Sequence, residues 1–351
     1  MTQADVGVPD PSMPAGVSIG LPVFNGMPDL PNALESLLAQ DVHEIEIVIS
    51  DNASTDGTAA YCEAMARRDP RVHYFRNEVN QGAAANFQRV VDLSTAPYFC
   101  WAAHDDVYSP NFVSACREVL LEHPEAGLCV PARRRVDETG VLISVRREPR
   151  GLASGDLETR LRAHLWRRGW LTIYGLWRRE ILTRIGPPLP VWGSDVILLW
   201  RALLLAPAQT LSEPLADYRI IREKPADTSI SALTGASSHA HLPNTKMLRY
   251  LKKASDDLGL SARDREIAER VLRRWVLTHH YRELMATDLL VESRRLRARG
   301  AELRAAALLP LVAVLGPRMV LNRLRSMRQS RDSSALVVGE GAIPRRESYE
   351  D

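Results

Sequence analysis

Short apolar runs alternate with longer amphipathic stretches through the first part of the chain. Four runs rich in β-branched and aromatic residues end in polar loops, which is typical of buried strands; they lie at 17–24, 45–51, 72–76 and 98–102. Each loop leads into a pattern with helical period, expected at 30–40, up to 68, from 83 and at 110–123. This alternation predicts an α/β fold with a Rossmann-like, mainly parallel sheet, flanking helices and right-handed crossovers.

The polar residues that follow these strands should meet at one edge of the sheet, because the carboxyl ends of parallel strands lie side by side. The residues expected to converge are Phe24, Asp51, Asn80 to Gly82 and Asp105. Asp105 and Asp106 come just after the run at 98–102, and adjacent carboxylates offer hard oxygen ligands for a divalent cation. The alternative is a polar turn that caps the helix beginning near Pro110.

Several motifs, in their order and spacing, make the chain resemble the family 2 glycosyltransferases of the GT-A fold over residues 17–222. They are Pro22-Val-Phe-Asn25, Leu34-Glu-Ser-Leu-Leu-Ala-Gln40, Ile47-Val-Ile-Ser-Asp-Asn-Ala-Ser-Thr-Asp-Gly-Thr58, Asn80-Gln-Gly82 with Asn86, and Asp105-Asp106 before Pro110. The resemblance implies a nucleotide-binding half that holds a sugar-nucleotide donor.

The resemblance also implies which residues hold that donor. Asp51 would hydrogen-bond the nucleobase, in a pocket lined by Pro22 and Phe24. A divalent cation, Mn²⁺ or Mg²⁺, would bridge the donor diphosphate to Asp105. The other nucleotide-sugar-binding residues implied by the motifs are Asn25, Asn80, Gly82, Asn86 and Asp106.

The chain departs from the family pattern at Ala103, where many members carry the first of the strand-end acids. Without that acid, the ribose contact has to come from another group. His104 could supply a hydrogen bond there, and a histidine with a structural role is the alternative. The same departure leaves a second function open, a catalytically silent sugar-nucleotide-binding or scaffold protein.

A further acid lies in Val191-Trp-Gly-Ser-Asp195, which opens an apolar helix. One interpretation makes Ser194 or Asp195 the N-cap of that helix. The resemblance implies that Asp195 is the general base of an inverting enzyme. A carboxylate suits this role because it can accept the proton of the acceptor hydroxyl as the nucleophile forms.

Three segments around these motifs also bear on function. The arginine-rich stretch at 133–147 is predicted as a hairpin, either a positive rim for phosphates and anionic acceptors or, as we favour, a solvated edge with cationic gatekeepers. The apolar, aromatic run at 170–177 is predicted as a strand on the acceptor side. Arg219 or Arg222 is expected to assist with the diphosphate.

Composition changes along the chain, together with the family resemblance, predict five segments. They are a disordered N-terminus (1–15), a GT-A glycosyltransferase domain (16–226), a flexible linker or lid (227–241), a helical C-terminal region (242–328) and a disordered tail (329–351). The apolar run at 305–316 would rise only ~18 Å as a helix, short of the ~30 Å hydrocarbon core. With the arginines that follow up to 328, it is expected either to lie in the headgroup region of a membrane or to pack against the domain or a twofold partner.

Overall composition narrows the class of protein. The 351 residues are 45% hydrophobic and 25% charged, which is an ordinary globular composition. The net charge of +2 gives the molecule no overall basic field, so no nucleic-acid partner is expected. The four cysteines stand singly and are predicted to be reduced core residues. The first sixteen residues hold no secretion signal, and no apolar run reaches the ~20 residues of a membrane span. A cytoplasmic protein is expected, with peripheral contact at the inner face of the plasma membrane.

These observations predict a metal-dependent, hexosyl-type glycosyltransferase of family 2. It would move a sugar from a nucleotide-diphosphate donor to a hydroxyl of a glycan or lipid-linked acceptor, as a monomer or a homodimer. Inversion, and a place in cell-envelope or extracellular glycan synthesis, follow from the resemblance alone. A nucleotidyltransferase is disfavoured because no glycine-rich, basic signature follows the first strand. The sequence does not specify the base, the sugar or the acceptor.

Overall fold

The computed structural model describes residues 16–166, 172–220, 243–278, 288–289 and 292. Its contacts divide the chain into two compact units, Met1–Val276 and Leu277–Asp351. Every helix and strand named below belongs to the first unit. The predicted disordered ends, the linker at 227–241 and the segment at 305–328 lie outside the described residues.

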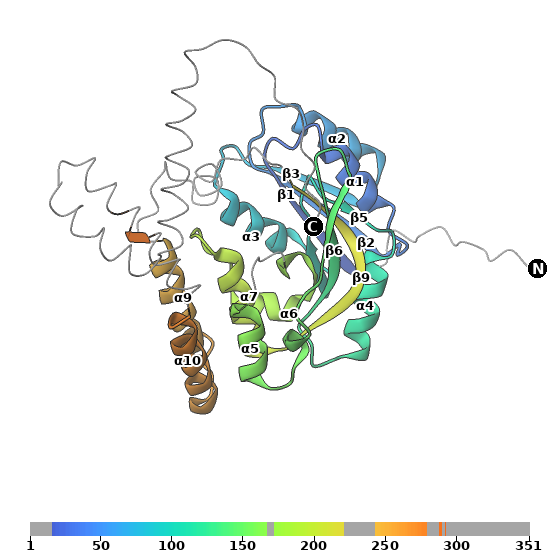
Figure 1. The fold of residues 1–351 in the computed structure, drawn as a ribbon. Coiled ribbons are helices and arrows are strands. Elements are labelled where there is room, and N and C mark those ends of the chain that lie inside the picture. Colours follow the sequence, from blue (N-terminus) through green and yellow to red (C-terminus); the bar gives the residue numbers. More distant parts are fainter. Residues whose placement is uncertain (1–15, 167–171, 221–242, 279–287, 290–291, 293–351) are drawn as a thin grey trace, which may run out of the picture. The chain divides into compact units, whose positions relative to one another are not determined.

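The amino-terminal half builds a parallel sheet from strand–helix units (Figure 1). Its strands are β1 (Val17–Val23), β2 (Ile45–Asp51), β3 (Val72–Arg76) and β4 (Tyr98–Trp101). Its helices are α1 (Leu30–Leu38), α2 (Thr58–Arg68) and α3 (Ala83–Leu93), and α4 (Phe112–Glu122) follows the short strand β5 (Val107–Tyr108). The predicted alternation of strands and helices is confirmed.

The remaining strands complete a nine-stranded sheet in the order β3-β2-β1-β4-β8-β6-β9-β5, with β7 beside β6. They are β6 (Leu128–Val136), β7 (Leu142–Arg146), β8 (Leu176–Arg178) and β9 (Ala208–Arg219). Strand β8 is antiparallel to both β4 and β6, and β9 is parallel to β6. Strands β6 and β9 therefore run in the same direction as β1 to β4. We call the edge where these strands end the carboxyl edge.

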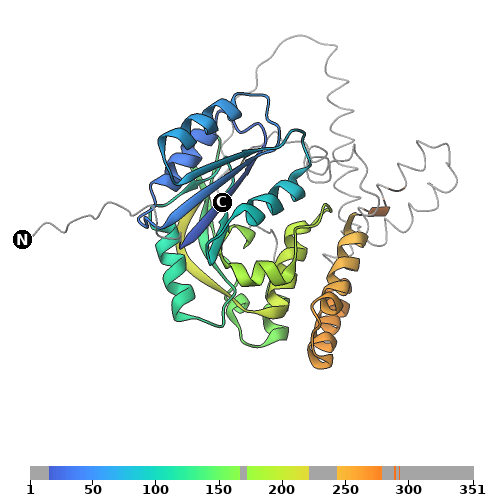
Figure 2. The same cartoon turned by 180° about the vertical axis from the view of Figure 1, so that it is seen from behind.

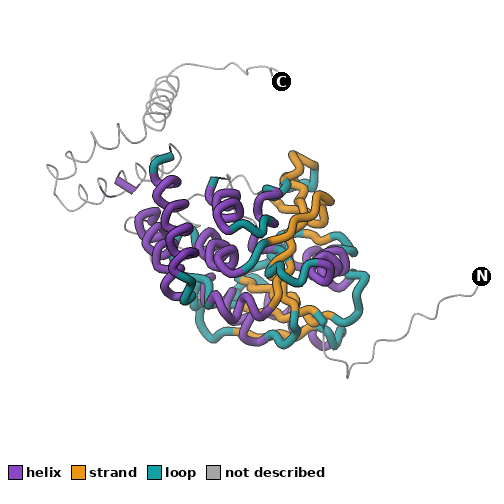
Figure 3. The backbone as a smooth tube through the Cα atoms, turned by 90° about the horizontal axis from the view of Figure 1, so that it is seen from below, coloured by secondary structure: helices purple, strands orange, loops and turns teal. Residues whose placement is uncertain are grey.

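Helices cover both faces of the sheet (Figures 1, 2 and 3). On one face, Ile19 and Leu21 pack with buried side chains of α1, α2 and α4. On the other face, Gly20 lies against Phe99 of β4 and Val90 of α3, where a Cβ would come within 2.6 Å of the Phe99 ring and 2.8 Å of the Val90 side chain. Glycine is required at this position because the helix and the strand approach so closely.

Helices α5 (Leu157–Leu165), α6 (Arg179–Ile185) and α7 (Ser194–Leu205) follow, with 3-10 turns η1 (Arg150–Ala153) and η2 (Thr172–Tyr174). The strand predicted at 170–177 is wrong in extent: residues 170 and 171 lie outside the described residues, Thr172–Tyr174 form η2, and the strand is β8 at Leu176–Arg178. A Cβ on Gly175 would lie 2.3 Å from the carbonyl oxygen of Cys129, and Trp177 Nε1 donates to Ile173 O at 2.7 Å. The aromatic residues thus stabilise a turn against β6.

Helices α9 (Pro243–Asp257) and α10 (Ala262–Val276) contact each other and pack on α7 and α5. Trp200 Nε1 of α7 donates a hydrogen bond to Leu251 O at 3.0 Å, and Arg274 of α10 pairs with Glu158 of α5 at 2.7 Å. The buried side chains include Met247, Leu251, Val271, Leu272 and Trp275. This part of the predicted helical region is therefore continuous with the unit that carries the sheet.

All four cysteines are buried and unpaired, as predicted. Burial raises the pKa of the Cys62 and Cys100 thiols to about 12, so both are protonated at neutral pH. They act as small apolar core residues.

Candidate active site

Asp51 ends β2 at the carboxyl edge, and its side chain is completely buried. Its Oδ2 accepts hydrogen bonds from Tyr74 Oη at 2.8 Å and Arg76 Nη1 at 3.0 Å, and its Oδ1 accepts one from Ser54 N at 2.8 Å. Arg76 covers the acid while 41% of its own side chain stays exposed. Asp51 therefore lies at the strand end where it was predicted. The structure adds that it is the hydrogen-bond partner of Tyr74 and Arg76. Its direct contact with a nucleobase stays a prediction.

A network of amides ties together the loops after β2 and β3. Asn52 Nδ2 donates to Asn80 Oδ1 at 2.8 Å, and Asn80 Oδ1 also accepts from Gly82 N at 2.8 Å. Asn86 is buried at the start of α3, where its Oδ1 accepts from Ser50 Oγ at 2.7 Å and its Nδ2 donates to Ser50 O at 2.8 Å. Asn80 and Gly82 converge as predicted, Asn86 joins them from α3, and the bonds they make position the backbone of the edge.

The loop after β1 is held in the same way. Asn25 has a left-handed backbone with φ of 51°, its Oδ1 accepts from Thr55 N at 2.8 Å, and its N donates to Ser54 Oγ at 2.9 Å. Pro22 is buried in the strand, whereas 45% of Phe24 is exposed. Of the predicted lining of a base pocket, Phe24 is thus the side chain available to stack on a ligand.

The two strand-end acids have different surroundings. Asp106 is buried, its Oδ2 lies 3.4 Å from Arg133 Nη1 of β6, and its Oδ1 accepts from Arg219 N of β9 at 3.3 Å. Burial raises the pKa of Asp106 to about 7, against the opposing effect of the Arg133 guanidinium. Asp105 is only partly buried. Asp106 thus joins β4 to β6 and β9, and Asp105 is the acid of the pair that reaches the surface.

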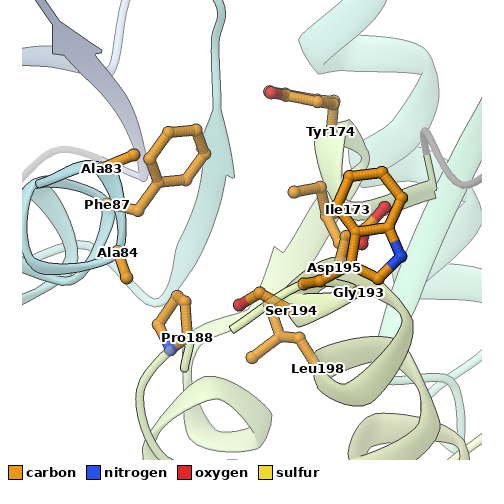
Figure 4. A pocket seen from close by; sticks show the side chains of 11 residues that line it. Ala83, Ala84, Phe87, Ile173, Tyr174, Pro188, Gly193, Ser194, Asp195 and Leu198 are labelled. Atoms are coloured by element: carbon orange, nitrogen blue, oxygen red, sulfur yellow. The ribbon is translucent and has the colours of Figure 1, made fainter. Parts of the chain in front are cut away.

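Asp195 lies in a pocket of about 290 Å³ between α3 and the start of α7 (Figure 4). The lining side chains are mostly apolar: Ala83, Ala84, Phe87, Ile173, Tyr174, Pro188, Trp192, Gly193, Ser194, Asp195 and Leu198. Phe87 of α3 and Tyr174 of η2 line the pocket in Figure 4, and their rings meet edge to face with centroids 6.5 Å apart. A carboxylate among apolar walls is a suitable place to orient a sugar and take a proton.

Helix α7 begins after Gly193, which is its N-cap with φ of 73°, so neither Ser194 nor Asp195 caps it. The capping interpretation of Asp195 is therefore wrong. Asp195 lies in the first turn, where the backbone N–H dipoles favour a negative charge. A Cβ on Gly193 would come within 2.4 Å of Met247 Sδ of α9, so α9 packs against the turn that places Asp195.

Tyr174 connects this pocket with the strand-end acids. Arg133 Nη2 donates to Tyr174 O at 2.5 Å, and the guanidinium carbon lies 5.3 Å from the centre of the Tyr174 ring. Arg133 also pairs with Asp106. Burial raises the pKa of Tyr174, with Asp106 and Asp105 among the charges that act in the same direction. One buried arginine therefore joins Asp106 of the carboxyl edge to Tyr174 in the wall of the pocket.

Sequence reasoning missed Phe87, and it missed the roles of Tyr174 and Arg133. The arginine run was interpreted mainly as a solvated edge, but Arg133 is 3% exposed and Arg134 pairs with Asp217. The signal for Arg133 was the run of three adjacent arginines on one predicted strand. Alternate side chains of a strand point to opposite faces, so at least one of the three had to face the interior side of the sheet.

Several smaller predictions also have outcomes in the structure. Arg219 pairs with Asp29 through its side chain, and Arg222 lies outside the described residues. At the position of the missing acid, Ala103 N donates to Tyr108 Oη at 3.2 Å. His104 lies close to Gly26 of the loop after β1, in keeping with a structural role.

The donor chemistry of the edge fits a divalent cation. Asp105 offers a hard carboxylate at a strand end, while the oxygens of Asp106 are engaged by Arg133 and Arg219. Within the described residues, no three His, Cys, Asp or Glu side chains form a metal-binding group. Mg²⁺-type ions commonly bind through one or two carboxylates and substrate phosphates, so Asp105 suffices for a cation that binds with a diphosphate.

Comparison with known families gives one domain match: residues 18–185 match the model of "Glycosyl transferase family 2". The GalNAc(5)-diNAcBac-PP-undecaprenol beta-1,3-glucosyltransferase of Campylobacter jejuni is 21% identical over 313 residues, which are 89% of this chain and 97% of that protein. The putative colanic acid biosynthesis glycosyl transferase WcaA of Escherichia coli is 31% identical over 109 residues, which are 31% of this chain and 38% of that protein.

Solved structures share the fold. The S. aureus TarS 1–349 structure in complex with UDP-GlcNAc has a TM-score of 0.57 at 14% identity and covers 82% of this chain and 88% of that one. The mannosyltransferase PcManGT from Pyrobaculum calidifontis, in complex with GDP-Man and Mn²⁺, has a TM-score of 0.53 at 18% identity and covers 94% and 88%. The sheet and its flanking helices thus have the GT-A architecture.

Proposed function

This glycosyltransferase carries a family 2 domain at residues 18–185, and we propose that it moves a sugar from a nucleotide-diphosphate donor to a hydroxyl acceptor with inversion. The observation that carries the proposal is the placement of Asp195. Its carboxylate lies in a mostly apolar pocket that Tyr174 and Arg133 connect to Asp106 of the carboxyl edge.

In this proposal Asp195 is the general base. It accepts the proton of the acceptor hydroxyl while that oxygen attacks the anomeric carbon and the bond to the diphosphate oxygen breaks. The contacting rings of Phe87 and Tyr174 offer the sugar one apolar surface, which orients it and keeps out water that would otherwise compete as the acceptor. Attack from the side opposite the leaving diphosphate inverts the anomeric configuration.

Asp105 would hold the divalent cation. When bound, Mn²⁺ or Mg²⁺ supplies positive charge that stabilises the departing nucleoside diphosphate. The chain contributes the remaining positioning: Asp106 fixes the backbone of β9 through Arg219 N, and the amide network fixes the loops after β2 and β3. The donor-binding roles of Pro22, Phe24, Asn25 and Asp51 belong to the same proposal.

A place in cell-envelope or extracellular glycan synthesis, with a glycan or lipid-linked acceptor, is supported by the names of relatives. The Campylobacter relative is named for an undecaprenol-linked acceptor, and WcaA for colanic acid biosynthesis. No described helix is long and apolar enough to cross a membrane. A cytoplasmic location at the inner face of the plasma membrane, a homodimer and contact through 305–328 remain proposals.

The test is transfer from a panel of uridine, guanosine and deoxythymidine diphosphate sugars, with Mn²⁺, to glycan and polyprenyl-diphosphate-linked acceptors. We expect one donor to release its nucleoside diphosphate and form an inverted product. Binding of a donor without release or transfer under any condition would instead support the catalytically silent protein that Ala103 suggests.

A further inference from the structure

The hairpin formed by β6 and β7 carries an exposed apolar segment. Val141, Leu142 and Ile143 are 61%, 55% and 45% exposed. The other large exposed apolar side chains of the described residues occur singly along the chain. Scattered single residues need no explanation, but a run of three adds solvent-exposed apolar area that a soluble surface usually avoids.

The turn presents this segment in a fixed conformation. Asp137 Oδ1 accepts hydrogen bonds from Thr139 N at 2.9 Å and Val141 N at 3.0 Å, while Asp137 N donates to Val141 O at 3.0 Å. Gly140 supplies the positive φ of 85° that the turn requires. The apolar residues therefore stand on an ordered strand.

Unpaired arginines follow the apolar segment on the same strand and just beyond it. Arg146 is partly buried, and Arg147 and Arg150 are exposed. None of these three takes part in an ion pair with any other described residue, although most arginines of α2, α5 and α10 do. The acids of the hairpin segment, Asp137, Glu138 and Glu148, all have interaction partners. The segment therefore presents free positive charge.

Gatekeeping of an exposed edge strand explains the arginines but not the aliphatic residues. The spacing suits a lipid surface better. Ile143 precedes Arg146 by three residues, so in a strand the apolar segment extends roughly 10 Å beyond the first arginine. Interfacial elements bury their apolar residues about 5–10 Å deep at the boundary between headgroups and acyl chains, with cations at the level of the phosphates.

The hairpin also lies at the edge that carries the active site. Strand β6 ends at Val136, beside Arg219 of β9, and Arg219 N is bonded to Asp106. The turn at 137–141 thus continues outward from the carboxyl edge. From this placement, together with the exposure and the charge, we propose that the β6–β7 hairpin docks on the surface of an anionic lipid bilayer and turns the active site toward it.

The native cysteines allow a direct test, because all four are buried. A Leu142→Cys variant of the full chain is labelled with an environment-sensitive fluorophore, and Leu121→Cys is the control. Leu121 is 65% exposed at the end of α4, where the chain returns to the amino edge of the sheet before β6. On vesicles of phosphatidylcholine with phosphatidylglycerol, the label at 142 should shift to the blue and the label at 121 should not. Phosphatidylcholine alone should give no shift.

Three results would overturn the proposal. The first is absence of vesicle binding, and the second is vesicle binding in which the label at 142 stays in water. The third is a blue shift that depends on protein concentration in the absence of vesicles, which would show that two copies pair through β7. Activity with a water-soluble acceptor should be unchanged by the label, so loss of docking and loss of the proposed transfer reaction are distinguishable.

Substitutions in the hairpin measure how much its arginines and its apolar side chains contribute to vesicle binding. Arg146→Gln with Arg147→Gln should weaken binding to the anionic vesicles about 25-fold, which is about fivefold for each cation near an anionic surface. Leu142→Ser with Ile143→Ser should weaken it about tenfold or more through lost apolar burial. Leu121→Ser should bind as the parent does. Equal binding by all variants would contradict the proposal.

Discussion

Asp105 and Asp106 are neighbours in the sequence that do different work. Asp106 is buried between β4, β6 and β9, and its oxygens pair with Arg133 and with Arg219 N. Asp105 is partly exposed at the same strand end. Both acids lie in the turn between β4 and β5, where Asp106 supports the structure; ligand binding by Asp105 is part of the proposed function.

Replacing Asp105 with Asn should remove the effect of Mn²⁺ on nucleoside diphosphate binding, because an amide carries no charge to hold the cation. Titration calorimetry with and without Mn²⁺ measures this. Asp69→Asn, at the opposite edge of the sheet before β3, should keep the parental Mn²⁺ effect. If Mn²⁺ still changed nucleoside diphosphate binding in Asp105→Asn, the cation would be bound by other residues.

Arg133→Met should destabilise the protein by about 3 kcal/mol, because it leaves both Asp106 and the carbonyl oxygen of Tyr174 buried without their shared hydrogen-bond donor. The midpoint of urea unfolding at neutral pH reports the change. Arg134→Met on the same strand removes a half-exposed pair with Asp217 and should change stability by less than ~1 kcal/mol. Equal losses of stability in the two variants would mean that the buried contacts of Arg133 contribute no more to stability than the partly exposed pair of Arg134.

Residue types and their places at strand ends could be predicted, but their partners could not. Asp51, Asn80 and Asp105 all reach the carboxyl edge as expected from the strand pattern. The bonds that enclose Asp51 come from Tyr74 and Arg76, more than twenty residues away. Such pairings depend on the register between β2 and β3, which a single sequence does not reveal.

At the scale of elements, α5 and α7 are joined by a buried histidine. His164 Nε2 lies 2.9 Å from Val196 O, and since a carbonyl only accepts, Nε2 carries the proton. Nδ1 is buried without a partner. Burial lowers the pKa of His164 from 6.5 to about 4, so the folded protein keeps this ring neutral.

This lowered pKa predicts a loss of stability in acid. Between pH 6.5 and about pH 4 the unfolded chain binds a proton at His164 that the folded protein excludes, so the free energy of unfolding falls as the pH falls through that range. The full contribution is roughly 3 kcal/mol. Urea unfolding of the parent and of His164→Gln at several pH values isolates the contribution of His164, because the carboxylates contribute equally to the pH dependence of both proteins. Parallel pH profiles would exclude the role of His164.

Elements with clear periodicity were predictable, and those set by packing between elements were not. Strands β1 to β4 and helix α4 follow the apolar patterns at 17–24, 45–51, 72–76, 98–102 and 110–123. The run at 170–177 has the composition of a strand, yet close approach of Gly175 to Cys129 turns most of it into η2 and a short β8. Contact with β6 overrides local propensity here.

At the scale of the whole molecule, the sheet, α5 to α7, α9 and α10 belong to one compact unit that ends at Val276. Helix α9 touches the turn at Gly193 that places Asp195, and Leu251 O accepts the hydrogen bond of Trp200. The predicted change of segment at 226–242 marked a composition shift. It could not show that the next helices complete the core behind α7.

Leu251→Ala should therefore destabilise the entire unit by about 2–5 kcal/mol, as expected for a fully buried leucine, and unfolding should stay a single transition. Circular dichroism and tryptophan fluorescence during urea unfolding test both points. Leu277→Ala, at a position 69% exposed, should change stability by less than ~0.5 kcal/mol. Separate loss of helix before loss of the sheet would contradict a single unit.

The most direct test of the proposed function is single-turnover transfer by Asp195→Asn, with a donor and an acceptor that the panel identifies. Asparagine keeps the size of the side chain in the pocket but cannot accept the acceptor proton, so we predict a rate at least ~100-fold lower with donor affinity unchanged. Asp256→Asn, on the exposed side of α9, is the control and should transfer at the parental rate. Transfer by Asp195→Asn at a rate near that of the parent would contradict the assignment of Asp195 as the base.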